Sequence, residues 1–179
     1  KHAINKMEDI SGLKIRVIQS PIYIDTFNAL GANAVPMPFT EVYTALEQKI
    51  IDGQENPFSV IETSKLNEVQ KHLTITNHIY NPQSVLASKK KIDALTKDER
   101  DLLTSTLAEA TKWQRENSRK LAEDSLTNLK KTMQVTTLSA EELTKIRAKV
   151  KPVIDKFAAS VGPEVVKELQ AELDKGRKK

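Results

Sequence analysis

The sequence predicts an α/β fold in which parallel strand pairings form the first half and helices fill most of the second half. Strand-like and helix-like segments alternate between residues 12 and 88, and such alternation is typical of parallel sheets. Residues 96–132 contain neither glycine nor proline, which predicts an uninterrupted helical region. One short strand-like segment and two further helical patterns complete the chain.

The first strand is predicted at "GLKIRVI", residues 12–18, where β-branched residues follow a glycine in near alternation. A helix should follow and end at Gly31. Its apolar stripe is Tyr23, Phe27 and Leu30. "NAVPMP", residues 33–38, predicts a strand at the edge or end of a sheet, because proline lacks the N–H that a central strand needs.

Two short helices are predicted next. Thr40 can cap the first, which should end at Asp52-Gly53, and Asn56-Pro57 places Asn at the N-cap and Pro at the first helical position of the second. The expected buried residues are Val42, Tyr43, Leu46 and Ile50 in the first helix, and Val60, Ile61 and Leu66 in the second. Residues 73–80 and 84–88 then have the character of strands.

A long helix is predicted to begin at "TKDE", residues 96–99, which forms a capping box. Its broken apolar stripe is Leu103, Leu107, Ala110, Leu121, Leu126 and Leu129. A helix of about 35 residues is about 50 Å long, so we expect a strut that contacts more than one body of the protein. Two helices with an unmarked bend are the alternative.

The last part of the chain should contain one strand and two helices. "QVTTL", residues 134–138, predicts the strand, and "SAEE", residues 139–142, is a second capping box that opens a helix. Pro152 should kink or end this helix, and Gly162-Pro163 should start the last one. The expected inward residues of that last helix are Val165, Val166, Leu169 and Leu173.

Composition narrows the class of protein. A hydrophobic content of 39% with mixed charges is typical of a soluble globular protein, and no apolar run approaches the roughly 20 residues that span a bilayer. The formal charge is +4 and only 4% of residues are aromatic, so we expect no nucleic-acid partner and interpret Arg177, Lys178 and Lys179 as a solvated basic end. The chain begins at Lys1 without an apolar signal region, which indicates a processed product or a piece of something longer.

Most catalytic and cofactor motifs are absent from the sequence. It has no cysteine, no Gly-rich phosphate loop, no HExxH and no GxSxG. His72 and His78 are six residues apart and do not share a helix face, so we predict no metal site and no cofactor. Most carboxylates lie beside lysines in helical patterns, which is typical of solvated ion pairs.

Three places suggest a ligand site. Arg16 lies between Ile15 and Val17 in the first strand, and on a covered face its guanidinium would need an anion, for example a carboxylate bound bidentately. A solvated face, or pairing with an internal glutamate, is an equal alternative. Phe39 precedes the Thr40 cap, where a hydrophobic staple is favoured over an apolar wall beside a ligand.

The third place is the polar corner of Gln54, Glu55 and Asn56. A helix start offers free N–H groups to an anion, although the residues alone favour a polar surface turn with a good cap.

Three blocks of sequence carry a resemblance to a known family. They are "DISGLKIRV" (9–17), "ALGANAVPMPFTEVYTALEQKIIDGQENP" (29–57) and "EVQKHLTITNHIY" (68–80). Together they resemble the solute-binding proteins of tripartite ATP-independent periplasmic (TRAP) transporters, of the dicarboxylate type that includes sialic-acid binders. The resemblance is strong from residue 9 to about residue 90 and follows only the outline of the family beyond that.

The resemblance implies a periplasmic-binding-protein-like (type II) lobe with a mixed sheet, a long strut helix and C-terminal helices. It implies a non-enzymatic protein of the periplasm, with its signal peptide removed, that captures an organic acid and delivers it to a membrane permease. By position in the motifs, Arg16 would form a salt bridge with the ligand carboxylate, Phe39 would pack on the ligand and Asn56 would donate a hydrogen bond. Gln19 and Ser20 would face the cleft. The residues that would support Arg16 from behind are Gln54, Glu55 and His78.

Family chains are longer and carry a first lobe before the "GLKIRV" strand. We therefore expect residues 1–80 to be the second lobe, residues 81–132 to be a crossing strand and long helix that belong partly to the first lobe, and residues 133–179 to be a C-terminal strand and helices. Without a first lobe, self-association is expected. Two other hypotheses are a helical interaction or oligomerisation module without a small ligand, and an enzyme that uses Glu55 and His78 as an acid–base pair.

Overall fold

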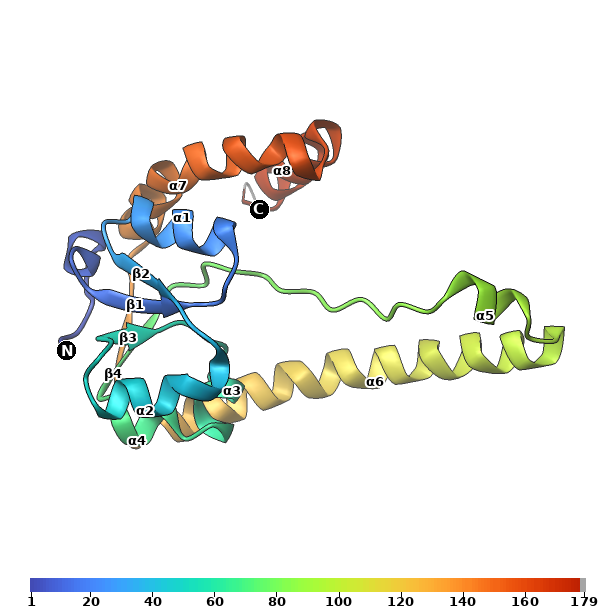
Figure 1. Cartoon of the computed structure of the whole chain (residues 1–179), viewed down its shortest axis with the longest axis horizontal. Coiled ribbons are helices and arrows are strands. Elements are labelled where there is room, and N and C mark those ends of the chain that lie inside the picture. Colours follow the sequence, from blue (N-terminus) through green and yellow to red (C-terminus); the bar gives the residue numbers. More distant parts are fainter. Residues whose placement is uncertain (178–179) are drawn as a thin grey trace.

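The structure is a computed structural model that describes residues 1–177, so Lys178 and Lys179 of the basic end lie outside the described residues. Its elements alternate as predicted in the first half and are mostly helical afterwards (Figure 1). In chain order they are η1 (Met7–Ile10), β1 (Lys14–Val17), α1 (Pro21–Ala29), β2 (Asn33–Pro36), η2 (Phe39–Glu41), α2 (Val42–Glu47), β3 (Gly53–Gln54), α3 (Phe58–Thr63), α4 (Leu66–Val69), β4 (His72–Ile75), α5 (Lys89–Asp93), α6 (Lys97–Leu129), β5 (Gln134–Thr137), α7 (Ala140–Val161) and α8 (Pro163–Arg177).

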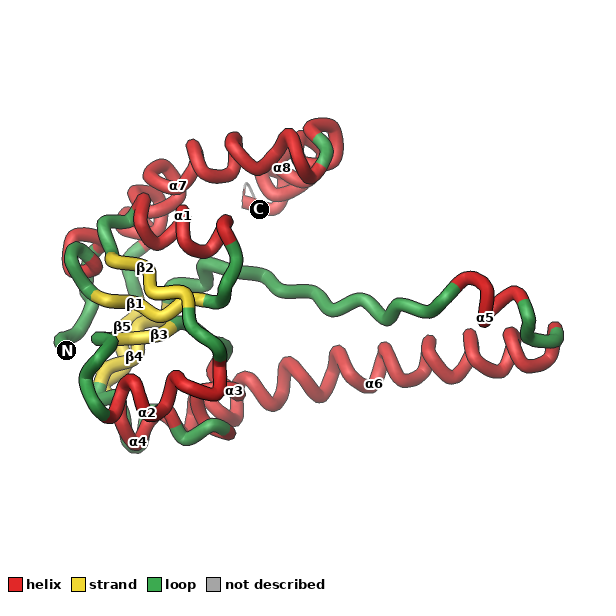
Figure 2. The backbone as a smooth tube through the Cα atoms, in the orientation of Figure 1, coloured by secondary structure: helices red, strands yellow, loops and turns green. Residues whose placement is uncertain are grey.

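The strands form two small sheets that lie near each other (Figure 2). One has the order β2-β1-β3 and the other pairs β4 with β5, and every described pairing is parallel. The α/β class is confirmed, and β2 lies at a sheet edge as its prolines predicted. The antiparallel component of the expected mixed sheet is not among these pairings, and residues 84–88 form no strand.

Two apolar clusters build the body of the protein. The first packs β1 against α1 and α7, with Val17 fully buried at its centre. The second lies under α2, α3 and α4 and includes the last turn of α6, with Val42 fully buried and Leu129 1% exposed. Because the clusters cover opposite sides of the three-stranded sheet, the sheet is enclosed by helices, as parallel sheets usually are (Figure 1).

The long helix is a single helix of 33 residues, α6, and the alternative of two helices is wrong. Thr96 and Glu99 cap each other's backbone reciprocally at its start, as the capping box predicted. Only its C-terminal end is buried, and the rest extends away from the body beside the extended segment that leads to α5 (Figure 1). In residues 1–177, no helix is both long enough and apolar enough to cross a bilayer.

Two predicted helix boundaries are wrong around residues 40–53. The 3-10 turn η2 precedes α2, and α2 has no side-chain cap from Thr40. The helix ends at Glu47, and Ile50 is exposed. The physical reason is that the Asp52 amide donates to the Lys14 carbonyl at 2.8 Å, so the chain must already be extended beside β1 before Gly53.

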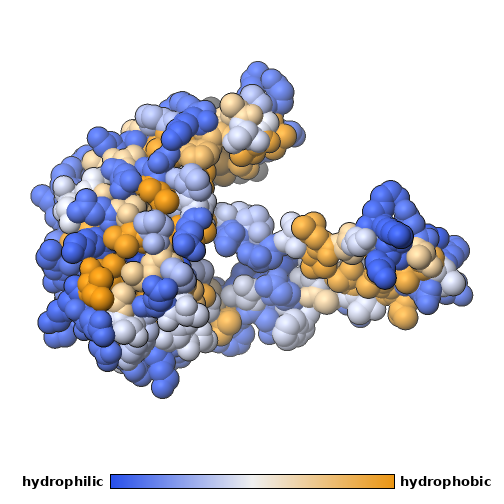
Figure 3. Space-filling model, viewed as in Figure 1, coloured by the Kyte–Doolittle hydropathy of each residue, from blue (hydrophilic) through white to orange (hydrophobic). Residues whose placement is uncertain are grey.

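The C-terminal helices differ from the prediction in two ways, and of the two outcomes predicted for Pro152 the end of the helix is wrong, because Pro152 lies inside α7. Ser139 caps this helix, but Glu142 accepts hydrogen bonds from Met7 and Lys145 instead of completing a capping box. Of the four residues predicted to face inward on α8, Val166 is half-buried, whereas Val165 is 61%, Leu169 55% and Leu173 41% exposed. Figure 3 shows both hydrophobic and hydrophilic side chains on the region that projects from the body here.

Candidate functional site

The predicted ligand residues gather at one edge of the β2-β1-β3 sheet. In a parallel sheet the carboxyl ends of the strands meet at the same edge, which is where ligands of open α/β sheets bind. Arg16 is the third residue of the central strand, and the segments that follow the three strands carry the other predicted residues. They are Gln19 and Ser20 after β1, Phe39 after β2, and Glu55 and Asn56 after β3.

Arg16 is buried, with an exposed fraction of only 3%, so the alternative of a solvated face is wrong. Its Nε and Nη2 donate to the carbonyl oxygen of Met37 at 2.9 and 2.7 Å. A guanidinium has five N–H donors, and across residues 1–177 no carboxylate forms an ion pair with this one. Burial lowers the pKa of Arg16, and the charge of Glu55 opposes that shift. The site therefore contains a buried cation with donors to spare.

Phe39 covers the guanidinium from the next loop. The centroid of its ring is 5.7 Å from Arg16 Cζ, which is the range of a cation–π contact. Phe39 is 44% exposed and lies at the start of η2, so the hydrophobic staple that the residues favoured is not formed. Phe39 therefore remains partly accessible beside Arg16.

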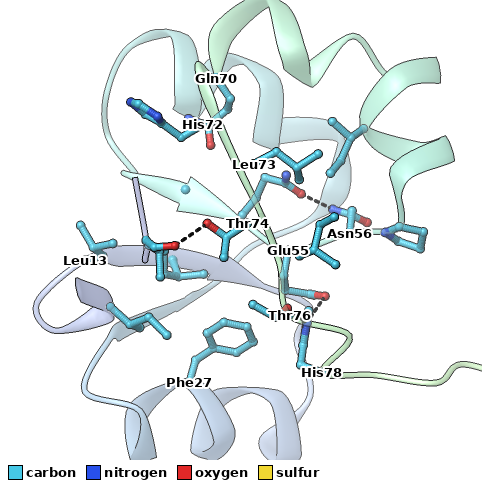
Figure 4. Close-up of a pocket in the computed structure, with 18 of the residues that line it drawn as sticks. Leu13, Phe27, Glu55, Asn56, Gln70, His72, Leu73, Thr74, Thr76 and His78 are labelled. Carbon is cyan, nitrogen blue, oxygen red and sulfur yellow. Dashed lines mark hydrogen bonds and ion pairs between the residues drawn. The ribbon is translucent and has the colours of Figure 1, made fainter. Parts of the chain in front are cut away.

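Asn56 is not the N-cap of a helix, which corrects the prediction. Pro57 occupies the cap position, α3 begins at Phe58, and no side chain caps it. Pro57 itself has an extended backbone, with ψ at 152°, so the helical dihedral angles begin one residue later than predicted. The Asn56 amide nitrogen instead donates to the side-chain oxygen of Gln54 at 2.6 Å, so both side chains are held at the end of β3 (Figure 4).

Glu55 and His78 form the polar pair that the resemblance implied. His78 Nε2 lies 3.2 Å from a Glu55 carboxylate oxygen, and His78 Nδ1 lies 2.6 Å from Thr76 Oγ1 (Figure 4). Phe27 packs its ring edge-on against His78, with centroids 5.6 Å apart. This arrangement fixes the carboxylate of Glu55, whose charge favours the protonated form of Arg16.

The roles of Gln19 and Ser20 are less defined by geometry. Gln19 is exposed and Ser20 is half-buried, in the loop between β1 and α1. Ser20 occupies the cap position of α1 without a side-chain hydrogen bond to it. Within the described residues, neither side chain forms a hydrogen bond with Arg16.

Three contributors were not predicted as site residues. The Met37 carbonyl is a backbone group, so no residue type marks it. Phe27 was assigned only to the apolar stripe of α1, and Thr76 reaches His78 because Asn77 between them has a left-handed conformation with φ at 46°. None of the three contributors offered a usable signal in the sequence.

A cavity of about 540 Å³ lies next to this edge, between β3 and β4 (Figure 4). Its lining includes Glu55, Asn56 and His78 but neither Arg16 nor Phe39, so the Arg16 guanidinium lies outside this cavity. In the part of the chain that the structure describes, no group of three or more potential ligands could hold a metal ion.

Comparison with known proteins shows a match to one protein family. Residues 1–160 match the model of bacterial extracellular solute-binding protein, family 7. The C4-dicarboxylate-binding periplasmic protein DctP of Rhodobacter capsulatus is 37% identical over 166 residues, which are 92% of this chain and 50% of that protein.

Two solved structures are also similar. The sugar acid binding protein DctPAm of Advenella mimigardefordensis, in complex with galactonate, is 47% identical with a TM-score of 0.88, covering 98% of this chain and 57% of its own. A TRAP periplasmic solute binding protein of Ochrobactrum anthropi, with its C-terminus bound in the ligand-binding pocket, is 53% identical with a TM-score of 0.92, covering 99% of this chain and 56% of its own. The chain thus spans about half the length of these relatives.

Proposed function

The chain belongs to the bacterial extracellular solute-binding protein family 7, and we propose that it supplies the carboxylate-binding lobe of a TRAP transporter receptor. Members of this family are binding proteins and not enzymes, which argues against the acid–base role of Glu55 and His78. The observation that carries the proposal is the buried guanidinium of Arg16, which has no carboxylate partner among residues 1–177.

Arg16 is the proposed anchor for the ligand. A buried cation is costly unless it is paired, and the Met37 carbonyl accepts only part of its donor capacity. A ligand carboxylate would complete the shell with bidentate, charge-assisted hydrogen bonds. The relatives support an acidic ligand, since one binds C4-dicarboxylates, one holds galactonate and one has its own C-terminus in the pocket.

Phe39 and Asn56 are proposed to contact the same ligand. The partly exposed side chain of Phe39 would pack on the carbon skeleton, and the amide of Asn56 would donate to an oxygen after exchanging its bond to Gln54. Gln19 and Ser20 would line the entrance, because they follow the central strand at the same edge. Glu55 and His78 would hold Arg16 charged and oriented without contacting the ligand.

The chain divides, in this proposal, as the sequence indicated. Residues 1–80 would be the second lobe, residues 81–132 would belong partly to a first lobe, and residues 133–179 would be a C-terminal strand and helices. The support is the environment of α6, where Leu103, Leu107 and Leu121 are exposed although they have helical core spacing. A first lobe would cover these leucines, and closure of the two lobes would trap the ligand.

The remaining assignments follow from the family. Delivery of the ligand to membrane permease subunits and a location in the periplasm are proposed for the whole protein, since the relatives are periplasmic proteins. Self-association, which the exposed helix suggested, receives no support from the comparisons. The helical interaction module is the weaker candidate, because it does not account for the buried Arg16.

Calorimetric titration of the whole gene product tests the proposal. Galactonate, succinate and sialic acid are the acids to use, with galactose as the neutral counterpart of galactonate. We expect at least one acid to bind and galactose not to bind. Arg16→Ala should weaken binding by about 2–5 kcal/mol, at least about thirtyfold, since the ligand anion loses its partner.

Arg16→Lys is the matched control. It keeps the charge but loses the planar fork, so a smaller loss of affinity is expected than for Arg16→Ala. Equal affinity of the wild type and Arg16→Ala for every acid that binds would remove Arg16 from the site and with it the proposed function.

A further inference from the structure

The outer edge of the three-stranded sheet is formed by β2, which pairs only with β1 within residues 1–177. The Asn33 amide donates to the Leu13 carbonyl at 2.8 Å, and the Met37 amide donates to the Val17 carbonyl at 3.2 Å. In a parallel ladder, alternate residues direct their N–H and C=O groups to the same neighbour. Residues 33, 35 and 37 therefore face β1, whereas residues 34 and 36 direct their backbone groups outward.

Neither of these two outward residues offers a free N–H donor. The Ala34 amide donates to Oδ1 of Asn28 at 3.1 Å. Pro36 has no backbone N–H at all. The edge of β2 therefore presents the carbonyl groups of Ala34 and Pro36 without a donor beside them. Two such edges cannot pair, because every hydrogen bond between strands needs an N–H from one of them.

The end of α1 places Asn28 where it can accept this hydrogen bond. The Gly31 amide donates to the Asn28 carbonyl at 2.9 Å, and Gly31 has a left-handed conformation with φ at 91°. This turn brings β2 back beside the last turn of α1, so the Asn28 side chain reaches the amide of Ala34. Asn28 is exposed and belongs to neither apolar cluster, so its side chain can be changed without emptying the core.

A second copy of the protein is the strand partner that this arrangement excludes. Identical edges meet as an antiparallel pair about a two-fold axis. With Ala34 of the two copies opposite each other, each Ala34 amide would donate to the Ala34 carbonyl of the other copy, which is the hydrogen-bonded pair of an antiparallel ladder. Exposed apolar surface lies beside this edge, because Ile50 is 53% exposed and lines a cavity of about 350 Å³ together with Met37.

We propose that Asn28 prevents two copies of the protein from associating through β2. A second copy on this edge would come close to Met37 and Phe39, which directly follow β2, so Asn28 also keeps the candidate site accessible. The inference does not depend on the ligand proposed above, because it uses only the backbone groups of β2 and the side chain of Asn28.

Analytical ultracentrifugation of the whole gene product tests the inference. Asn28→Ala frees the Ala34 amide, so the self-association constant should rise at least about tenfold over the wild type, as two added hydrogen bonds predict. Asn28→Asp keeps an acceptor for the Ala34 amide and should match the wild type. Asn128→Ala is the matched control, since it removes an exposed asparagine of α6, far along the chain from β2, and should also match the wild type.

A double variant, Asn28→Ala with Ala34→Pro, identifies the donor. Proline removes the freed N–H and is tolerated in an edge strand, so the double variant should return to the wild-type association constant. Association caused by partial unfolding would not be reversed in this way. In Asn28→Ala alone, hydrogen exchange of the Ala34 amide should slow as the protein concentration rises, which locates the contact. The inference is overturned if Asn28→Ala associates no more strongly than the wild type, or if the double variant associates as strongly as Asn28→Ala.

Discussion

The two ends of α6 carry the same type of residue in opposite environments. Leu129 at its C-terminal end is 1% exposed and packs in the second apolar cluster, whereas Leu103 and Leu107 toward its start are 38% and 37% exposed. Both ends have the spacing of a core-facing helix, and one helix contains them all. The difference shows that apolar periodicity predicts a face that can be covered, while the cover itself must come from another part of the structure.

The same contrast separates the body from the projecting parts. In the body, strands and helices cover each other and leave Val17 and Val42 fully buried. The segment that leads to α5 leaves Leu86 89% and Tyr80 91% exposed. The body therefore contains the buried contacts that stabilise the described chain, and the projecting parts carry apolar side chains that the described residues leave exposed.

Leucine truncation should give the largest contrast. Leu129→Ala should lower the free energy of unfolding of the chain by about 2–5 kcal/mol, because it empties a buried site. Leu107→Ala, on the same helix, should change it by no more than about 0.5 kcal/mol, as exposed sites do. Urea unfolding followed by circular dichroism measures both.

The cost of the two leucine substitutions should also be measured in the whole gene product. If a first lobe covers α6, Leu107→Ala should cost clearly more there than in the chain of residues 1–179. A cost that stays near zero in the whole gene product would contradict the proposed assignment of residues 81–132.

The two helix caps should give a smaller contrast. Ser139 Oγ accepts from the Glu142 amide at 3.2 Å in the body, and Thr96 Oγ1 accepts from the Glu99 amide at 3.3 Å in the projecting end of α6. Ser139→Ala should lower the free energy of unfolding by about 1 kcal/mol. Thr96→Ala should instead fray the first turns of α6, seen as faster amide exchange there with the unfolding midpoint unchanged. Equal shifts of the midpoint would show that the projecting end unfolds together with the body.

The smallest expected effect is on how the free energy of unfolding changes at acidic pH. Hydrogen bonds from Lys145 and from the Met7 amide hold the pKa of Glu142 below its usual range. A glutamate whose pKa is lower in the folded state than in the unfolded state stabilises the fold at pH values above the ordinary glutamate pKa. This contribution is lost as the pH falls through the folded-state pKa. Glu142→Gln should therefore make the loss of stability at low pH shallower, as measured by urea midpoints along a pH series.

Glu99→Gln is the counterpart in the projecting part. The pKa of Glu99 is also lowered, by hydrogen bonds from the Thr96 amide and hydroxyl. Because this end is not part of the body, its substitution should leave the acid dependence of global unfolding unchanged. An effect as large as that of Glu142→Gln would erase the distinction between the two regions.

The sequence predicted correctly those helices and strands whose start is marked by residues next to them in the chain. The glycine before the β-branched run located β1, and the capping box located the start of α6. Asn56 was misplaced as a cap because Pro57 can occupy either of two adjacent positions at a helix start. The apolar stripe of α8 was wrongly expected to face inward, since the pattern does not tell what lies opposite it.

The candidate site was predictable in its residues and less so in its contacts. Arg16 at the centre of the sheet and the pair of Glu55 and His78 are placed together by the fold. The hydrogen bonds from Arg16 to the Met37 carbonyl have no sequence signal, because every residue carries a carbonyl group. The alternating pattern around Arg16 also left open which face was covered, and only packing against the neighbouring segments decides it.

A crystal structure of the whole gene product with a bound acid tests the central claim most directly. The account predicts a ligand carboxylate oxygen about 2.7–2.9 Å from a guanidinium nitrogen of Arg16, with the ring of Phe39 against the ligand. A ligand whose carboxylate is held by other residues, while Arg16 bonds only to the Met37 carbonyl, would contradict it.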